Sequence, residues 1–466
     1  MAETKWSRRN FINTVGLAGS SIAAFPAATT GAIMNQNKGI KIDKCSSNFE
    51  REPLIRPFGF KGGYMSEIWQ TAAWIKSSSG IDKIGLCSQN VLWSDAKFFS
   101  NFSEAGGNSI MYSMTDYALH LLEGAEFDSP VEVLDEILEE VYNYGKKITA
   151  NNNLRKTFAL NALVGIDNAL WMIYAAENGI TSFDKMIPEK YRAALANRHK
   201  KVASIPLMAY SIPVSEIKDA ADEGYFFMKI KIGQPGTQEE MLEKDKARLS
   251  EIHKTIGHYR TPHTKNGKLP YYFDANGRYE KKESLFKLLD HAKKIGAFDQ
   301  IAIIEEPFPE HAEIDVSDIP VRLAADESAH TDSDALKRIE MGYTAIALKA
   351  IAKTLSMTLK IANVAQKRNI PCFCADLTVN PILVDWNKNV AARLDPFPGL
   401  GIGLLETNGH QNYKNWKKME EYHPYTNAAW RKTKNGIFDL GADFYAKSGG
   451  VLKDSPHYMK MFEKFR

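Results

Sequence analysis

The strongest constraint on the fold is a series of short apolar runs that alternate with amphipathic segments from residue 204 onward. Helical patterns such as SEIKDAADEG and SLFKLLDHAKKIG fill most gaps and end near glycine or asparagine. This alternation predicts a parallel sheet covered by helices. The eight runs are 204–210, 225–232, 269–275, 301–306, 321–326, 344–349, 370–376 and 399–406.

Eight such units in about 200 residues predict a (β/α)8 barrel, the TIM-barrel form of an α/β fold. An open, doubly wound sheet is the alternative, but no G-x-G-x-x-G turn follows the first run. Residues 53–200 have a different pattern, with strands predicted at 69–76 and 83–88 and a helix through 160–174. We therefore expect a separate α+β domain ahead of the barrel.

Charged residues stand at the carboxyl ends of the predicted barrel strands. In a parallel barrel these ends converge on one mouth, where the active site lies. The second to the eighth strands contribute, in order, Lys229 with Lys231, Asp274, Glu305, Asp326, Lys349, Asp376 and Glu406.

Asp274, Glu305 and Asp326 come from three successive strands. Neighbouring strands lie about 4.8 Å apart, so these carboxylates can meet around one ion. Without a cation they would repel one another, and oxygen ligands suit Mg²⁺. Each acid taken alone would be a solvated strand-end residue, but the three together predict a metal site.

The segment MKIKIG, residues 228–233, places two lysines on one face of a strand, because strand side chains alternate. Lys229 and Lys231 would face the mouth, and Ile230 and Ile232 the outer helices. A nearby cation would depress the pKa of a lysine and make it a competent general base. Lys349 would approach from the opposite side, so two lysines could remove a proton from one face and return it on the other.

The set MKIKIG, DANG, IEEP, ADES and LK resembles the enolase superfamily, in particular the K-x-K enzymes of the mandelate racemase and muconate lactonizing enzyme group, which include dipeptide epimerases. The resemblance implies a modified (β/α)8 barrel at 204–430, an N-terminal α+β capping domain at 53–200, and a C-terminal segment, 431–466, that packs on the capping domain. It also implies one Mg²⁺ per subunit, with Mn²⁺ as a possible substitute.

Residue roles follow from the same resemblance. Lys231 and Lys349 correspond to the acid/base pair, and Lys229 to a contact for the substrate carboxylate. Asn276 and Glu327 would support the metal and the lysines. From their position at the mouth, and not from the resemblance, Asp376 and Glu406 would bind substrate or make structural hydrogen bonds. The Mg²⁺ ligands would be Asp274, Glu305 and Asp326.

Several segments depart from the family pattern. KAIAKTLSM lacks the usual glycine pair, and Lys353 in it competes with Lys349, unless it is a solvent-exposed cation at a helix start. LLETNG lacks the D-x-D of dipeptide epimerases, and CFCAD lacks a seventh-strand histidine, which disfavours a Lys/His pair. We expect His410 to be a surface residue.

Trp93 and Phe98 belong to the segment before the barrel. They would shape substrate specificity or only pack between the domains.

These observations predict an isomerase: a racemase or epimerase that abstracts the proton α to a carboxylate through an enediolate. Its substrate would be a small carboxylate, either an amino acid derivative or a dipeptide-like molecule. A dehydratase of acid sugars or hydroxy acids, which is a lyase, or a cycloisomerase would use the same first step. The alternative from another class is a non-catalytic periplasmic binding protein.

The N-terminus contains S-R-R-N-F-I followed by small and mildly apolar residues, which is typical of a twin-arginine export signal. We expect the signal to span 1–32 and the protein to be exported folded to the periplasm; a disordered basic tail is the alternative. A net charge of +3 is too small to indicate a nucleic-acid partner. No later apolar run reaches 18 residues, so no membrane span is expected after signal removal. A homo-oligomer is expected.

Overall fold

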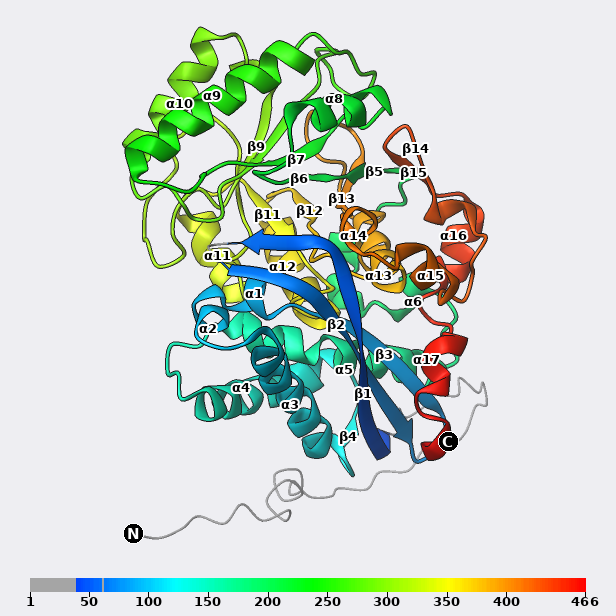
Figure 1. The fold of residues 1–466 in the computed structure, drawn as a ribbon. Helices are drawn as coiled ribbons and strands as arrows, with labels where there is room; N and C mark the ends of the chain where they lie inside the picture. Colours follow the sequence, from blue (N-terminus) through cyan, green and yellow to red (C-terminus); the bar gives the residue numbers. More distant parts are fainter. Residues whose placement is uncertain (1–38, 61–62) are drawn as a thin grey trace, which may run out of the picture. The chain divides into compact units, whose positions relative to one another are not determined.

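The computed structural model describes residues 39–60 and 63–466, and Gly39–Arg466 is one compact unit (Figure 1). The predicted twin-arginine signal, 1–32, lies outside the described residues.

A four-stranded antiparallel sheet comes first, in the order β3-β2-β1-β4. Its strands are β1 (Ile40–Phe60), β2 (Gly63–Ser77), β3 (Asp82–Gln89) and β4 (Glu126–Phe127). Three long helices accompany it: α3 (Glu104–Leu122), α4 (Pro130–Thr149) and α5 (Lys156–Glu177). The two strands and the helix predicted here are confirmed. Strand β1 was missed because 40–52 is largely polar, and its pairing with β2 makes it a strand.

The second sheet contains the predicted parallel barrel strands, in the order β5-β13-β12-β11-β10-β9-β8-β7-β6. Pro206 divides the first barrel strand, because proline has no N–H to continue a ladder. The half before it, β5, pairs with β13, and the half after it, β6, pairs with β7. One interrupted strand thus closes the ring, and the predicted (β/α)8 fold is confirmed. The strands are β5 (Lys201–Ile205), β6 (Leu207–Met208), β7 (Met228–Lys231), β8 (Tyr271–Asp274), β9 (Ile301–Glu305), β10 (Leu323–Ala325), β11 (Ala345–Leu348), β12 (Cys372–Cys374) and β13 (Gly403–Glu406).

Helices alternate with these strands, and several begin at side-chain caps. Thr237 and Thr331 form capping boxes with Glu240 and Asp334. Asn380 caps a helix that begins with proline. The helices are α8 (Val214–Asp222), α9 (Gln238–Ile256), α10 (Lys282–Lys294), α11 (Asp332–Glu340), α12 (Leu355–Lys367) and α13 (Pro381–Ala391).

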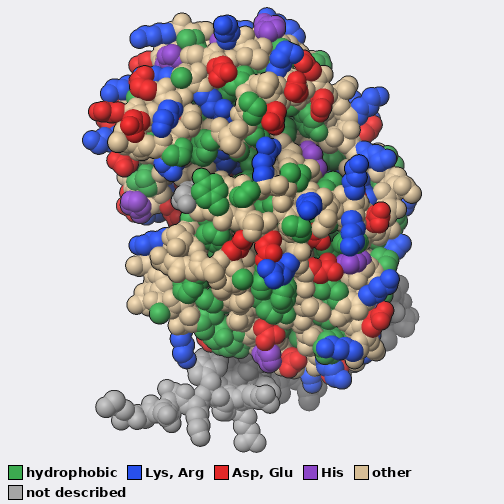
Figure 2. All heavy atoms as spheres, in the orientation of Figure 1, with side chains coloured by type: hydrophobic (Ala, Val, Ile, Leu, Met, Phe, Trp, Pro, Cys, Tyr) green, Lys and Arg blue, Asp and Glu red, His purple; other side chains and the backbone are tan. Residues whose placement is uncertain are grey.

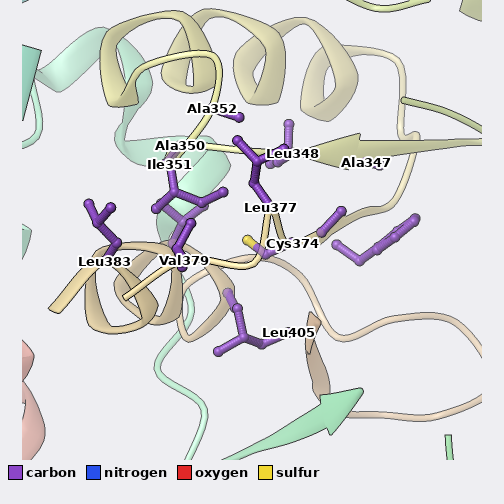
Figure 3. Packing of buried hydrophobic residues seen from close by; sticks show 14 of the residues in the cluster. Ala347, Leu348, Ala350, Ile351, Ala352, Cys374, Leu377, Val379, Leu383 and Leu405 are labelled. Atoms are coloured by element: carbon purple, nitrogen blue, oxygen red, sulfur yellow. The ribbon is translucent and has the colours of Figure 1, made fainter. Parts of the chain in front are cut away.

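Apolar side chains pack around the carboxyl ends of β11, β12 and β13 (Figure 3). Leu348, Cys374 and Leu405 are fully buried there, beside Ile351 and Leu377 from the following loops. The four cysteines, all in the described part of the chain, are free, and three are buried like small apolar residues. This core fixes the strand ends that carry the charged residues.

The C-terminal segment contacts both sheets. The hairpin of β14 (Thr433–Lys434) and β15 (Ile437–Asp439) extends the barrel sheet by antiparallel pairing with β5. Farther on, Lys83 and Asp454 form an ion pair of 2.7 Å, and Phe462 stacks on Trp74 of β2. The short helices here are α16 (Ala442–Lys447) and α17 (Pro456–Lys460).

Within the described ranges, only α5 is long and apolar enough to cross a membrane, but 94% of its apolar window is buried inside the protein. It packs against β3, β2 and α4, as the core helix of a domain does. On the face shown in Figure 2, basic and acidic side chains are interspersed.

Candidate active site

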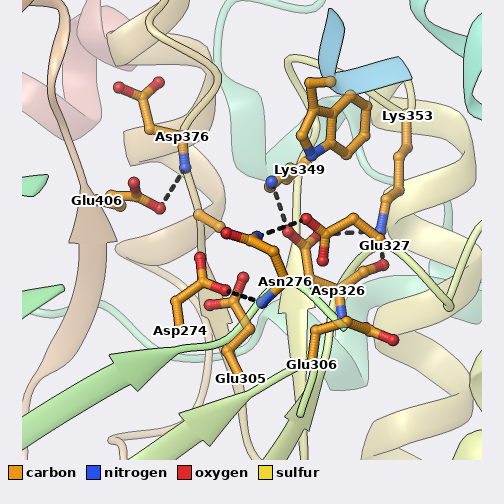
Figure 4. A network of polar contacts seen from close by, with 12 residues as sticks. Asp274, Asn276, Glu305, Glu306, Asp326, Glu327, Lys349, Lys353, Asp376 and Glu406 are labelled. Carbon is orange, nitrogen blue, oxygen red and sulfur yellow. Dashed lines mark hydrogen bonds and ion pairs between the residues drawn. The ribbon is translucent and has the colours of Figure 1, made fainter. Parts of the chain in front are cut away.

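One cavity of about 40 Å³ lies where the barrel strands end. Nine of the ten predicted site residues line it, and Glu305, the tenth, is fully buried. Figure 4 shows side chains that converge at these strand ends: Asp274, Glu305, Asp326, Glu327 and Lys349. The wall is completed by Phe58 and Met65 of the N-terminal sheet and by Leu92 and Trp93 of the short helix that follows β3. A cavity of this volume has room for only a few water molecules, because the charged side chains that line it lie close together.

The two β7 lysines share Asp274, and each also has partners of its own. The Nζ of Lys229 lies 2.9 Å from Asp274, 3.0 Å from Glu305 and 3.2 Å from Glu406. Burial lowers the pKa of Lys229, but these carboxylates outweigh it and raise that pKa well above its usual value. Lys231 Nζ lies 2.6 Å from both Asp274 Oδ2 and Asn276 Oδ1.

Oxygen atoms of Glu305, Asp326 and Glu327 lie within 4.8 Å of one another, so these three could hold one metal ion. The sequence prediction included Asp274 in place of Glu327. Burial raises the pKa of Asp274, yet Lys229 and Lys231 outweigh it and lower that pKa to about 2. Asp274 is therefore ionised and paired with lysines beside the cluster, where it remains a candidate ligand.

Burial makes three of the acids at this site hard to ionise. Four lysines, Lys229, Lys231, Lys349 and Lys353, lie among seven buried carboxyl groups. Three of the seven have raised pKa values, principally because of burial: about 8 for Glu305, about 7 for Glu306 and about 7 for Asp376. The other four acids are Asp274, Asp326, Glu327 and Glu406.

These residues fit a hard divalent cation. The excess of acids over lysines would be relieved by a bound positive charge, and carboxylate oxygens are the ligands that Mg²⁺ prefers. Glu327 Oε2 is buried and has no hydrogen-bond partner among the described residues. An unpaired buried carboxylate oxygen is costly, and a cation would satisfy it.

Asn276 and Glu306 hold the loops that carry these acids. Asn276 Nδ2 donates to Glu327 Oε1 over 2.8 Å, and Glu306 Oε2 accepts from the backbone N–H of Asp326 over 2.8 Å. Both have positive φ angles, 46° and 40°, in the left-handed region. This role of Glu306 was not predicted, because within IEEP only Glu305 was expected to act at the site.

Asp376 and Glu406 are linked to each other. Glu406 Oε2 accepts from the Asp376 N–H over 3.0 Å, and Asp376 Oδ2 accepts from the Asn408 N–H over 2.7 Å. Burial comes first among the causes that raise the pKa of Asp376, and Glu406 comes second. Both acids therefore line the cavity while making structural hydrogen bonds.

Comparisons with known proteins agree with this fold. Residues 214–400 match the family described as enolase C-terminal domain-like. The fold is that of the enolase superfamily. No curated protein sequence matches this chain.

Solved structures resemble the chain at low sequence identity. A dipeptide epimerase from Enterococcus faecalis V583, complexed with Mg and L-Leu-L-Tyr, has 16% identity and a TM-score of 0.59, covering 86% of this chain and 97% of that one. A dipeptide epimerase from Cytophaga hutchinsonii, with Mg and D-Ala-L-Val, has 16% identity and a TM-score of 0.58, covering 80% and 88%. An enolase-superfamily member from Listeria innocua Clip11262 has 16% identity and a TM-score of 0.60, covering 88% and 94%.

The segment KAIAKTLSM, which follows the sixth barrel strand, contributes two lysines that pair with Asp326. Lys349 Nζ lies 2.5 Å from Asp326 Oδ2 and 4.5 Å from the ring centre of Trp93. Lys353 Nζ lies 3.3 Å from Asp326 Oδ1 and donates to the backbone oxygens of Asp326 and Ala329 over 2.6 and 3.0 Å. Lys353 is fully buried, so its interpretation as an exposed helix-start cation is wrong.

The ammonium of Lys353 donates to three acceptors, so all its donors are used and Lys353 is poorly placed to act as a base. Lys349, whose ammonium lines the cavity, remains the candidate. His410 is exposed and lies outside this cavity, as expected. Phe98 packs against Phe102 and Phe158, whereas Trp93 reaches the cavity.

Proposed function

We propose that this protein is a Mg²⁺-dependent racemase or epimerase of the enolase superfamily, which abstracts the proton α to a carboxylate. The observation that carries the proposal is the placement of Lys231 at the end of β7 and Lys349 just after β11, four strands apart in an eight-stranded ring, with the acidic cluster between them. The dipeptide epimerases among similar structures support the same reaction class.

Glu305, Asp326 and Glu327, with Asp274 beside them, would hold the cation. A bound Mg²⁺ would act as a Lewis acid toward the substrate carboxylate. Lys229, charged and buried, would offer its ammonium to the same carboxylate as negative charge develops there. These residues would lower the cost of removing an α-proton, which is otherwise weakly acidic.

The two lysines would act on opposite faces of the substrate. Burial lowers the pKa of Lys349, but Asp326 outweighs it, so that pKa is raised in this structure. When Asp326 is neutralised by a cation, this raising cause weakens and burial favours the neutral amine. Lys349 would then accept the proton from one face while Lys231 donates one to the other face, which inverts the configuration.

We infer a small carboxylate substrate, either an amino acid derivative or a dipeptide-like molecule. Phe58, Met65, Leu92 and Trp93 form an apolar wall suited to an apolar side chain. Elimination or cycloisomerisation would begin with the same proton abstraction. We also infer a homo-oligomer that is exported folded to the periplasm, on the evidence of the S-R-R-N-F-I segment for the export route.

Proton NMR in D₂O tests the proposal. Purified protein with Mg²⁺ is incubated with dipeptides, N-acyl amino acids and sugar acids, and α-proton exchange is followed alongside Lys231→Ala and Lys349→Ala variants. Exchange with inversion that requires both lysines would support a racemase or epimerase. Exchange with loss of a β-substituent would identify a dehydratase. Absence of exchange across all classes, in protein that binds Mg²⁺, would favour the binding-protein alternative.

A further inference from the structure

The Trp93 indole covers one of the two candidate catalytic lysines. Its ring centre lies 4.5 Å from Lys349 Nζ, and Trp93 itself is only 6% exposed. Trp93 belongs to the short helix α1 (Val91–Ser94), in the N-terminal part of the chain, whereas Lys349 follows β11 of the barrel. An aromatic face at this distance attracts an ammonium and shields it from water.

A single guanidinium connects this helix to the barrel. Arg155, the residue before α5, donates from Nη1 to the backbone oxygens of Trp93 and Ser94 over 3.3 and 3.4 Å. From Nη2 it donates to the backbone oxygen of Glu327 over 3.0 Å and pairs with Glu310 Oε2 at 2.6 Å. Arg155 therefore touches the tryptophan's own peptide and the peptide of an acid in the candidate metal cluster.

Three further contacts hold the backbone of α1 and the side chain of Glu310. Asn90 Oδ1 accepts from the Trp93 N–H over 2.9 Å, and the hydroxyl of Thr157 donates to the Ser94 oxygen over 2.7 Å. Glu310 also pairs with His330. Burial raises the pKa of Glu310, but His330 and Arg155 outweigh it, so this acid stays ionised as a partner for Arg155.

We propose that Arg155 is a positioning residue for Lys349, because it fixes the Trp93 indole over that lysine. Arg155→Lys would keep the positive charge. Its single ammonium nitrogen could not reach both the acceptors on α1 and the Glu327 oxygen, which the two terminal nitrogens of the planar guanidinium contact together. The proposal rests on the proposed function only for its catalytic consequence. The covering of Lys349 is a property of the fold.

Reductive methylation with formaldehyde and a borohydride reagent tests the covering without any substrate. Peptide mass mapping gives the ratio of Lys349 to Lys231 modification within the same molecules, so general unfolding would affect both lysines. We expect this ratio to rise about tenfold in Trp93→Leu and Arg155→Lys. Trp93→Phe, which keeps a ring, and Arg431→Lys should stay within about twofold of wild type. Arg431 is a matched control because it donates to the backbone oxygens of Tyr425 and Thr426.

The catalytic consequence is measured as α-proton exchange with L-Leu-L-Tyr or another acid that the wild type exchanges. Each lysine reaches the α-proton of only one epimer, so both epimers of the acid are measured. In a Lys231→Ala background the epimer whose α-proton faces Lys349 should still exchange, and Arg155→Lys should slow that exchange about tenfold, since even a small displacement of a catalytic group slows the reaction. In a Lys349→Ala background the same change should have little effect. An unchanged modification ratio, or equal slowing in both backgrounds, would overturn the inference. Absence of exchange in wild type would count against the proposed function and leave the modification result standing.

Discussion

Mg²⁺ binding should release a proton from Glu305. Burial raises the pKa of this carboxyl to about 8 despite the nearby Lys229. At pH 7 a group with that pKa is about 90% protonated, and at pH 9 about 10%. A metal ligand must be deprotonated, so binding at pH 7 should release about 0.9 proton, and at pH 9 about 0.1.

The same competition sets the pH dependence of affinity. A raised pKa means that protons oppose Mg²⁺ below pH 8, so the affinity rises with pH and levels off above it. The dissociation constant should be about tenfold larger at pH 7 than at pH 9. Isothermal titration calorimetry in two buffers of different ionisation enthalpy gives both the proton count and the affinity.

Glu305→Gln should lose this proton release and bind Mg²⁺ more weakly at every pH. Asp376→Asn is a matched control, because burial also raises the pKa of Asp376, to about 7, but Asp376 lies outside the cluster of Glu305, Asp326 and Glu327. It should keep most of the release. Binding without proton release at pH 7, or full release in Glu305→Gln, would refute the assignment of Glu305 as a ligand.

Three further predictions concern other parts of the chain. Lys353→Met should lower the free energy of unfolding by about 3 kcal/mol in urea titrations, because it breaks the buried ion pair with Asp326. Lys360→Met, which breaks a partly exposed ion pair with Asp135, should lower it by less than about 1 kcal/mol. Burial raises the pKa of Asp167 to about 7. The stability that its protonated form contributes is therefore complete below the unfolded pKa of about 4 and is lost as the pH rises toward 7. In urea titrations, the free energy of unfolding should decline less between pH 5 and pH 8 in Asp167→Asn than in wild type. Replacing Arg8 and Arg9 together by lysine should retain the protein in the cytoplasm of a host with twin-arginine transport, as cell fractionation would reveal; normal export of this variant would contradict the signal assignment.

Local patterns allowed much of the fold to be predicted. The alternation of apolar runs and helical segments predicted the barrel because strand and helix periodicities are properties of neighbouring residues. Parallel strands also share one direction, so a charged residue at each strand end had to reach the same mouth. Strand β1 was missed because its pairing with β2, and not an apolar pattern, holds it in place.

Contacts between distant segments could not be predicted in the same way. The sequence could not show that Lys353 is buried on Asp326, because a lysine near a helix start is usually solvated, and only the folded loop supplies three acceptors. Nor could it show Arg155 reaching Glu327, which lies 172 residues away.

The sequence by itself therefore determined the barrel and the residues gathered at its mouth, because both follow from periodicity and strand direction. Only the tertiary structure decided how the lysines pair with the acids, since side-chain direction at a crowded site depends on every neighbour at once. It also decided which part of the N-terminal chain covers the barrel: Trp93 meets Lys349 through packing between segments more than 250 residues apart, which no local pattern records.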